Sequence, residues 1–154
     1  MEKIEIIKVT DKNEKSEIVR DVLLDLPEWF GLPESTEEYI EDARGLPLWV
    51  AKEEEETIGF VTLKEATKDC GDVHCTGVKK AYHRQGIGHL LMSELVEEAK
   101  TQYEYLQVKT VDEGHYKEYD QTIAFYRNFG FRKLEVFPTL WDEWNPCLIM
   151  VMKI

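Results

Sequence analysis

The sequence predicts a single domain of the α/β (α+β) class, in which helices flank a mixed β-sheet. The chain has 154 residues, which is enough for one domain with its own hydrophobic core. Of these residues 43% are hydrophobic and 11% aromatic, as is typical of globular proteins. Strand-like and helix-like segments follow one another without an internal repeat or a linker.

Seven segments have the β-branched and aromatic residues, or the alternation, that is typical of strands. We expect strands at residues 3–10, 46–52, 57–65, 70–78, 105–111, 131–137 and 147–153. The acidic run at 53–56 is expected to form a solvated hairpin turn and not a metal site, because consecutive carboxylates on a flexible tip do not converge on an ion. Residues 138–146 separate the last two predicted strands.

Four segments carry the apolar stripe or the end signals of helices. We expect helices at residues 14–26, from Ser35 or Thr36 to 43, from 86 to about 102, and at 121–128. Pro27 should end the first helix. Asp120 could cap the last helix, and Gly130 should stop it in a left-handed conformation.

The charge balance narrows the range of partners. The chain has 31 acidic and 19 basic residues, a net charge of −12. Such a surface repels the phosphates of nucleic acids and anionic lipids, so we expect neither nucleic acid nor membrane as a partner. An acidic surface favours a cationic substrate or ligand, although most surplus carboxylates simply keep a protein solvated.

The expected location is the cytoplasm. The start of the chain has no apolar stretch of signal-peptide length, and no later segment approaches the length of a membrane span. The three cysteines are odd in number and lack CxxC spacing, so reduced thiols are the simplest account.

The most informative stretch is the glycine-rich turn that opens the third predicted helix. Gly86 and Gly88 leave the backbone bare where the helix begins, and such a place suits an anion, usually phosphate. Basic residues lie beside it: Lys79, Lys80 and Arg84. A dinucleotide fingerprint would need a third glycine where Leu91 stands, and a Walker loop would need Lys and Ser or Thr after the last glycine. The remaining alternative is an ordinary tight turn.

Two motifs resemble the signatures of the GNAT superfamily of N-acyltransferases. Residues 78–88, VKKAYHRQGIG, resemble its acyl-CoA pyrophosphate loop, and residues 124–131, AFYRNFGF, resemble its second signature. The element order also matches. Residues 109–110, 119–126 and 141–150 are similar to a bacterial subgroup of unassigned substrate.

The resemblance implies a GNAT-like fold and a cosubstrate. The fold would be a mixed, mostly antiparallel sheet of about seven strands with splayed central strands, flanked by about four helices, in one domain over residues 1–154. The cosubstrate would be acetyl-CoA, without a metal. Its pantetheine arm would lie along backbone of Thr76, Gly77, Val78 and Lys80, and its pyrophosphate on Arg84, Gln85, Gly86, Ile87, Gly88 and His89. His83 stands where the family usually has Arg or Gln, which leaves its phosphate contact open; Tyr119 replaces a usual Asn and takes over no role.

The resemblance also implies the chemistry: a neutral amine attacks the thioester directly. Tyr126 matches the family tyrosine that protonates the departing sulfur and also borders the cofactor, whereas its alternative role is core packing. The general base stays open between Asp72 and His74 on the fourth predicted strand, with His115 and Asp142 as further candidates.

The acceptor is expected to be a small cationic amine. Aromatic and acidic residues could enclose it: Trp29, Phe30, Trp141 and Asp142 as the main candidates, with Trp144 and the rim acids Glu37, Glu38, Asp112, Glu113 and Glu143. One alternative is a protein lysine or N-terminus. Another is a CoA-binding regulatory or interaction module without turnover. A homodimer could form through the aromatic segment 140–144.

Overall fold

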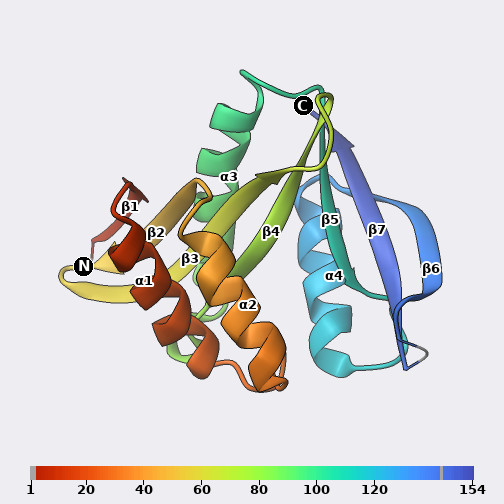
Figure 1. Cartoon of the computed structure of the whole chain (residues 1–154), viewed down its shortest axis with the longest axis horizontal. Coiled ribbons are helices and arrows are strands. Elements are labelled where there is room, and N and C mark those ends of the chain that lie inside the picture. The colour runs from red at the N-terminus through yellow and green to blue at the C-terminus, as the bar shows by residue number, and fades with distance from the viewer. Residues whose placement is uncertain (1–2, 143) are drawn as a thin grey trace. The chain divides into compact units, whose positions relative to one another are not determined.

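The structure, a computed structural model, describes residues 3–142 and 144–154. Its elements follow the predicted order (Figure 1). They are β1 (Ile4–Val9), α1 (Lys12–Leu24), α2 (Pro33–Ala43), β2 (Leu48–Glu53), β3 (Glu56–Glu65), β4 (Cys70–Val78), a 3-10 helix (Lys80–Tyr82), α3 (Ile87–Ala99), β5 (Tyr105–Val111), α4 (Lys117–Phe129), β6 (Arg132–Asp142) and β7 (Asn145–Lys153). The seven strands have the order β1-β2-β3-β4-β5-β7-β6. The predicted fold class is therefore confirmed.

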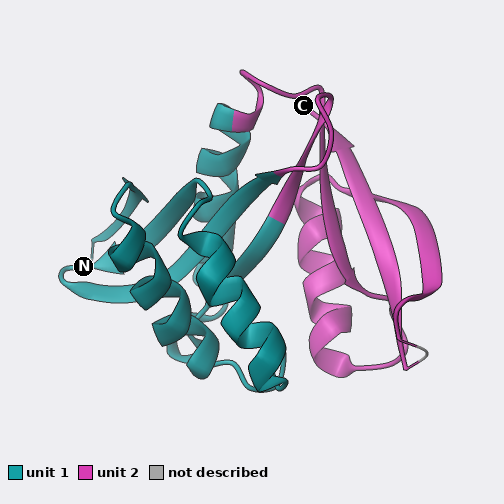
Figure 2. Ribbon diagram, viewed as in Figure 1, with its two compact units in different colours: residues 1–64, 74–98 teal, residues 65–73, 99–154 magenta. Residues whose placement is uncertain are grey.

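The chain divides into two compact units (Figure 2). The first unit contains the chain up to Lys64 together with His74–Glu98, and the second contains Glu65–Val73 and Ala99–Ile154. Strand β4 contributes to both: its residues Cys70–Val73 belong to the second unit, and the rest belongs to the first.

The first unit is built on the antiparallel strands β1, β2 and β3. Helix α1 begins after Asp11, whose carboxylate accepts a hydrogen bond from the Glu14 amide at 2.8 Å. The buried face of α1 packs into the core with residues of α2 and the strands: Ile18, Val19, Val22, Leu23, Ile40, Val50 and Phe60. The apolar stripe read from the sequence is the face that forms this core.

Helix α2 begins earlier than predicted. Pro33 is its first residue, and Leu32 is the N-cap residue without a capping side chain. Proline suits this position because its fixed φ angle matches the helix and it needs no amide partner there. The Thr36 hydroxyl donates back to the Leu32 carbonyl at 3.1 Å. The prediction of a cap at Ser35 or Thr36 was therefore wrong.

Two strand glycines allow close packing within the first unit. A Cβ added at Gly59 in β3 would lie 2.9 Å from the Gly77 carbonyl oxygen and 3.2 Å from Val78 Cγ2. A Cβ at Gly77 in β4 would lie 2.9 Å from Leu26 Cδ1. These contacts are shorter than van der Waals distance. The end of β4 is therefore packed against β3 on one side and against the α1 region on the other.

The second unit surrounds β5. Residues Cys70–Val73 of β4 pair with β5 in parallel, and β7 pairs with both β5 and β6 in antiparallel registers. Helix α4 ends at Gly130, whose φ of 135° favours glycine, as predicted. The buried side chains of this unit include Leu106, Val108, Ile123, Tyr126, Phe131, Leu148 and Met150.

Two boundaries in the second unit differ from the prediction. Helix α4 begins at Lys117 with Tyr116 as its N-cap residue, so Asp120 lies within the first turn and does not cap the helix. The Asp120 carboxylate instead accepts from the Gly114 amide at 2.9 Å. Strand β6 continues to Asp142, where a loop was expected. Pro138 is tolerated there because β6 is an edge strand, in which a missing amide donor can face solvent.

We predict that Gly59→Ala lowers the free energy of unfolding by about 1–3 kcal/mol, because the added methyl group would press on the Gly77 carbonyl. Gly45→Ala is the matched control, since its Cβ would meet only Asp42 O, at 4.0 Å. Urea denaturation measures both. Equal stability of the two variants would contradict the packing described here.

Candidate functional site

The candidate site is the turn between β4 and α3 in the first unit. Arg84 and Gly86 have positive φ angles of 65° and 79°. The Gly86 carbonyl accepts from the Leu90 amide at 3.1 Å, which places the first turn of α3 directly after Gly86. The amides of this first turn have no partner within the helix, and the helix dipole adds partial positive charge there. The turn therefore suits an anion.

Gly86 leaves room for such an anion. A Cβ added there would meet no heavy atom within 4 Å, and its φ strains any L side chain. The backbone at the helix start is thus open to approach. These two properties fit a bound phosphate group, which needs close contact with the amides. Ile87, which follows, is buried and fixes the helix to the core, while Gln85 and His89 are exposed.

The basic residues before the turn are largely neutralised by acids of the first unit. Lys79 Nζ contacts Asp21 Oδ2 at 2.9 Å, and Lys80 Nζ contacts Glu28 Oε2 at 3.1 Å. Hydrogen bonds from the Glu28 backbone and from Lys80 hold the pKa of the Glu28 carboxyl below its usual value. Arg84 is exposed, and no ion-pair partner for it appears among residues 3–142 and 144–154. Arg84 is therefore the cation best placed for a ligand.

Hydrogen bonds between side chains and backbone fix the end of β4 and the residues that follow it. The Thr76 hydroxyl donates to the Phe60 carbonyl at 2.9 Å. The His83 Nε2 lies 2.6 Å from the Val78 carbonyl, an acceptor, so Nε2 carries the proton. The Lys80 amide donates to Asp25 Oδ2 at 2.7 Å. The His83 ring is thus directed at the strand end, and the phosphate contact left open for it gains no support.

His74 lies on β4 two residues before Thr76. Its Nε2 is 3.1 Å from Asp42 Oδ2, and its ring packs edge-on against Tyr39 with centroids 5.4 Å apart. Both partners come from α2. His74 was predicted from the sequence, but Asp42 and Tyr39 were not, because 32 residues separate Asp42 from His74 and no motif links them.

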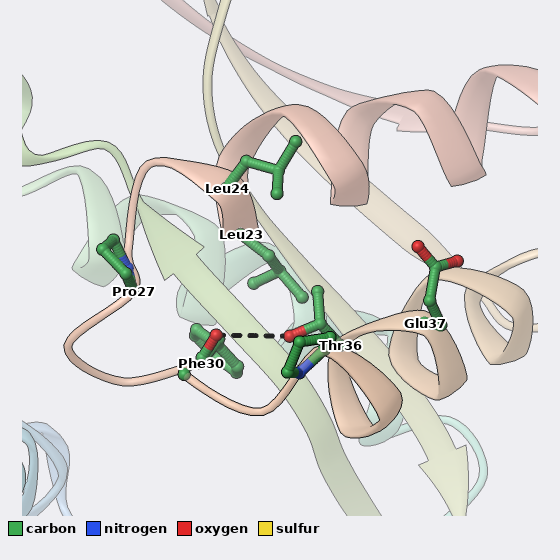
Figure 3. A pocket seen from close by; sticks show the side chains of 8 residues that line it. Leu23, Leu24, Pro27, Phe30, Thr36 and Glu37 are labelled. Atoms are coloured by element: carbon green, nitrogen blue, oxygen red, sulfur yellow. Dashed lines mark hydrogen bonds between the residues drawn. The ribbon is translucent and has the colours of Figure 1, made fainter.

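The two aromatics of the α1–α2 loop have different surroundings. Trp29 packs edge-on against His83 with centroids 5.8 Å apart. Phe30 lines a cavity of about 160 Å³, where its carbonyl accepts from the Thr36 hydroxyl at 3.3 Å (Figure 3). The cavity is mostly apolar; its lining also includes Leu23, Leu24, Pro27 and Glu37. Glu37 is paired with Arg20 at 2.8 Å, which lowers the pKa of the Glu37 carboxyl.

The second unit holds two of the proposed catalytic residues, Asp72 and Tyr126. Asp72 is only 8% exposed, and its Oδ1 accepts from Gln107 Nε2 at 3.2 Å. Tyr126 is 6% exposed on α4 and packs edge-on against Phe125 and Phe131. The buried ring agrees with the packing role that the sequence left open, and it does not test the catalytic one.

Two further predicted residues, Trp141 and Asp142, lie at the end of β6. Trp141 is 45% exposed. Asp142 accepts at 2.9 Å from the backbone amides of both Trp144 and Asn145, so it forms the turn into β7. Glu143, which was expected at the rim, lies outside the described residues. The structure thus brings Thr76, His74, Trp29, Phe30 and the glycine turn together in one unit, and it places Asp72, Tyr126, Trp141 and Asp142 in the other.

The three cysteines are poor nucleophiles in this structure. Burial raises the pKa of the Cys75 thiol far above its usual value. Burial also raises the pKa of Cys70 and of Cys147, in both cases assisted by the negative charge of Asp72.

Two kinds of feature are absent from the described part of the chain. No group of three or more His, Cys, Asp or Glu side chains there is arranged to hold a metal ion. No helix within it has both the length and the apolar character that a membrane span requires.

A family model described as "Acetyltransferase (GNAT) domain" matches residues 44–133 of the chain. The N-alpha-acetyltransferase RimI of Mycobacterium tuberculosis is 36% identical over 63 residues, which are 41% of this chain and 35% of that relative. The match therefore spans about a third of the relative's length.

Solved structures share the fold. A GNAT family acetyltransferase from Elizabethkingia anophelis, solved with acetyl-CoA bound, has a TM-score of 0.75 at 20% identity and covers 98% of both chains. The PaiA N-acetyltransferase of Thermoplasma acidophilum, solved with coenzyme A, has a TM-score of 0.75 at 16% identity and covers 99% of both chains.

We predict that a disulfide reagent modifies only Cys70 in the native protein, slowly, and reaches Cys75 and Cys147 after unfolding. Because each pKa is raised, less thiolate is present near the usual thiol pKa of about 8.5 than in free cysteine, and the rate should rise only at higher pH. Thiol counting on wild type and Cys70→Ser tests this. Fast native modification of Cys75 or Cys147 would contradict it.

Proposed function

The chain belongs to the acetyltransferase (GNAT) domain family, and we propose that it transfers the acetyl group of acetyl-CoA to a primary amine. The observation that carries this proposal is the open, positive-φ turn at Gly86, which presents the start of α3 to an anion. Both units contribute residues to the matched range 44–133, which supports one domain as the working enzyme.

The proposed cosubstrate site follows β4 into α3. The pyrophosphate would bind backbone amides at the start of α3, with Arg84 as the nearest available cation. The residues of this segment are Gln85, Gly86, Ile87, Gly88 and His89. The pantetheine arm would run back along the backbone of Thr76, Gly77 and Val78. A backbone contact suits Thr76, because its hydroxyl is already engaged with Phe60. Among the proposed cosubstrate contacts Lys80 has the least support, because its backbone amide contacts Asp25 and its ammonium group contacts Glu28.

The proposed chemistry needs two proton transfers. Acetyl-CoA supplies a thioester: the amine nitrogen forms the new bond to the carbonyl carbon as the bond from carbon to sulfur breaks. A base takes the proton that the amine loses, and Tyr126 donates its phenolic proton to the departing sulfur. A phenol and a thiol have comparable acidity, so this transfer is feasible.

Between the two proposed bases the geometry favours His74. The Asp72 carboxylate is buried and already accepts from Gln107. His74 lies in the unit that carries the proposed cosubstrate site, and its side chain keeps 16% of its surface exposed. An imidazole is also suited to accept a proton near neutral pH.

We propose a small cationic amine as acceptor, with Trp29, Phe30, Trp141 and Asp142 as candidate contacts. The net charge of −12 supports a cation. A protein N-terminus is the alternative that the similarity to RimI favours, because that relative is named an N-alpha-acetyltransferase. A CoA-binding module without turnover is the third possibility, and cytoplasmic location and dimerisation stay predictions.

We predict that acetyl-CoA and CoA, but not ATP, stabilise the wild-type protein by about 2.7 kcal/mol at ~100-fold above the dissociation constant. Gly86→Glu should abolish this stabilisation, because it places a strained anionic side chain where the phosphates bind. Gly114→Glu is the matched control, with a φ of 89° and the same open space. Thermal unfolding measures each case. Stabilisation that survives Gly86→Glu would place the site elsewhere.

We predict that Tyr126→Phe lowers kcat about 100-fold or more while acetyl-CoA binding is unchanged, because only the proton donor is lost. The assay follows CoA release with spermidine, an aminoglycoside, an amino acid amide and an N-terminal peptide as acceptors. Tyr116→Phe, at an exposed tyrosine before α4, is the control. Acetylation of the peptide alone would favour the N-terminal alternative. Unchanged kcat in Tyr126→Phe would remove its role as acid.

A further inference from the structure

We propose that Asp42 is a positioning residue for catalysis, which holds the imidazole of His74 with its proton on Nε2, so that Nδ1 is the nitrogen that takes the proton of the acceptor amine. The inference rests on the proposed function and names how the base at that site is prepared. Nothing in the motifs points to Asp42, because it lies on α2, outside both of them.

The first observation is the hydrogen bond between the two side chains. His74 Nε2 and Asp42 Oδ2 are 3.1 Å apart. An ionised carboxylate can only accept, so the proton of a neutral imidazole must lie on Nε2. The lone pair is then on Nδ1, which becomes the proton-accepting nitrogen. One contact thus selects the reactive nitrogen of His74.

The second observation is that aromatic rings hold the plane of the imidazole. Tyr39, one turn before Asp42 on α2, meets the His74 ring at an interplanar angle of 63°. Phe30 in turn packs edge-on against Tyr39 with centroids 5.9 Å apart. Tyr39 and Phe30 also pack on the buried core of the first unit. The ring is therefore fixed by packing as well as by a hydrogen bond.

The third observation is the position of His74 along β4. It precedes Thr76 by two residues, on the same face of the strand, which corresponds to about 6.6 Å. If the pantetheine arm follows Val78 toward Thr76, its reactive end points toward His74. All of these residues belong to the first unit.

The step balances within these groups. The amine nitrogen bonds to the acetyl carbon as the bond from that carbon to the CoA sulfur breaks. The departing sulfur takes its proton from Tyr126, and the proton that the amine loses moves to Nδ1 of His74. The imidazole becomes an imidazolium, and the carboxylate of Asp42 stabilises this positive charge. Asp42 itself keeps no proton and does not touch the substrate, which distinguishes it from the base.

A purely structural pair that ties α2 to β4 would show the same distance, so the test needs a readout of proton position. Nitrogen-15 NMR of histidine-labelled protein, at mildly alkaline pH and with His74→Gln for assignment, reports which nitrogen carries the proton. We expect a His74 Nε2–H resonance that is protected from exchange with water and is lost in Asp42→Ala. A proton on Nδ1, or a resonance unchanged in Asp42→Ala, would overturn the inference.

Kinetics on the same variants test the catalytic consequence, with spermidine and an N-terminal peptide as acceptors. We expect His74→Gln to lower kcat about 100-fold or more. Asp42→Ala should lose a smaller part of the same factor with the KM for acetyl-CoA unchanged, and Asp42→Glu should restore part of it. Glu41→Gln removes a neighbouring exposed charge and should behave as wild type.

The outcomes separate the two proposals. Wild-type protein that binds acetyl-CoA but acetylates no amine would contradict the proposed function and the inference with it. Active protein whose kcat is unchanged in Asp42→Ala would contradict the inference alone. Loss of kcat together with loss of thermal stability in Asp42→Ala, but not in Asp42→Glu, would assign Asp42 a structural role and also overturn it.

Discussion

The backbone conformation of the turn between β4 and α3 is the constraint on which the proposed activity depends. Positive φ angles at Arg84 and Gly86 direct the chain into α3 and leave the helix start open. Two hydrogen bonds hold the segment before the turn: the Lys79 amide donates to the Ile58 carbonyl at 2.9 Å, and His83 contacts the Val78 carbonyl. Binding charge with amides that are already in place avoids the entropic cost of ordering long side chains. If acetyl-CoA binds at this turn, as proposed, backbone amides would let an acidic protein hold a polyanion with few available cations.

Helices α1 and α2 connect this turn to the rest of the first unit. Gly77 lets the α1 region approach β4 closely, and Trp29 from the loop after α1 packs on His83. Helix α2 supplies Tyr39 and Asp42 to His74. The helices and the loop between them therefore contact both the glycine turn and the candidate base. Changes in its packing should affect cosubstrate and acceptor together.

Much of the fold could be predicted from local patterns. The bounds of β4 and β5 agree with the prediction. Valine and threonine recur in both strands, at Val73, Thr76 and Val78 in β4 and at Val108, Thr110 and Val111 in β5. The starts of α2 and α4 and the end of β6 were wrong. Pro33 suits the first helical position through its fixed φ angle, and Asp120 and Asp142 accept hydrogen bonds from backbone amides that composition does not reveal. In the site, the glycine turn was predicted from its motif. The Asp42–His74 contact could not be, since it depends on how a helix packs over a strand 32 residues away.

A crystal structure of the protein with acetyl-CoA would test the central claim most directly. The account predicts the pyrophosphate within hydrogen-bond distance of amides in the Gly86–His89 segment, and the arm along Thr76–Val78 with its reactive end next to His74. Cosubstrate bound at another surface, or no cosubstrate in crystals grown at saturating concentration, would contradict the account. The glycine turn would then be only a connection between a strand and a helix.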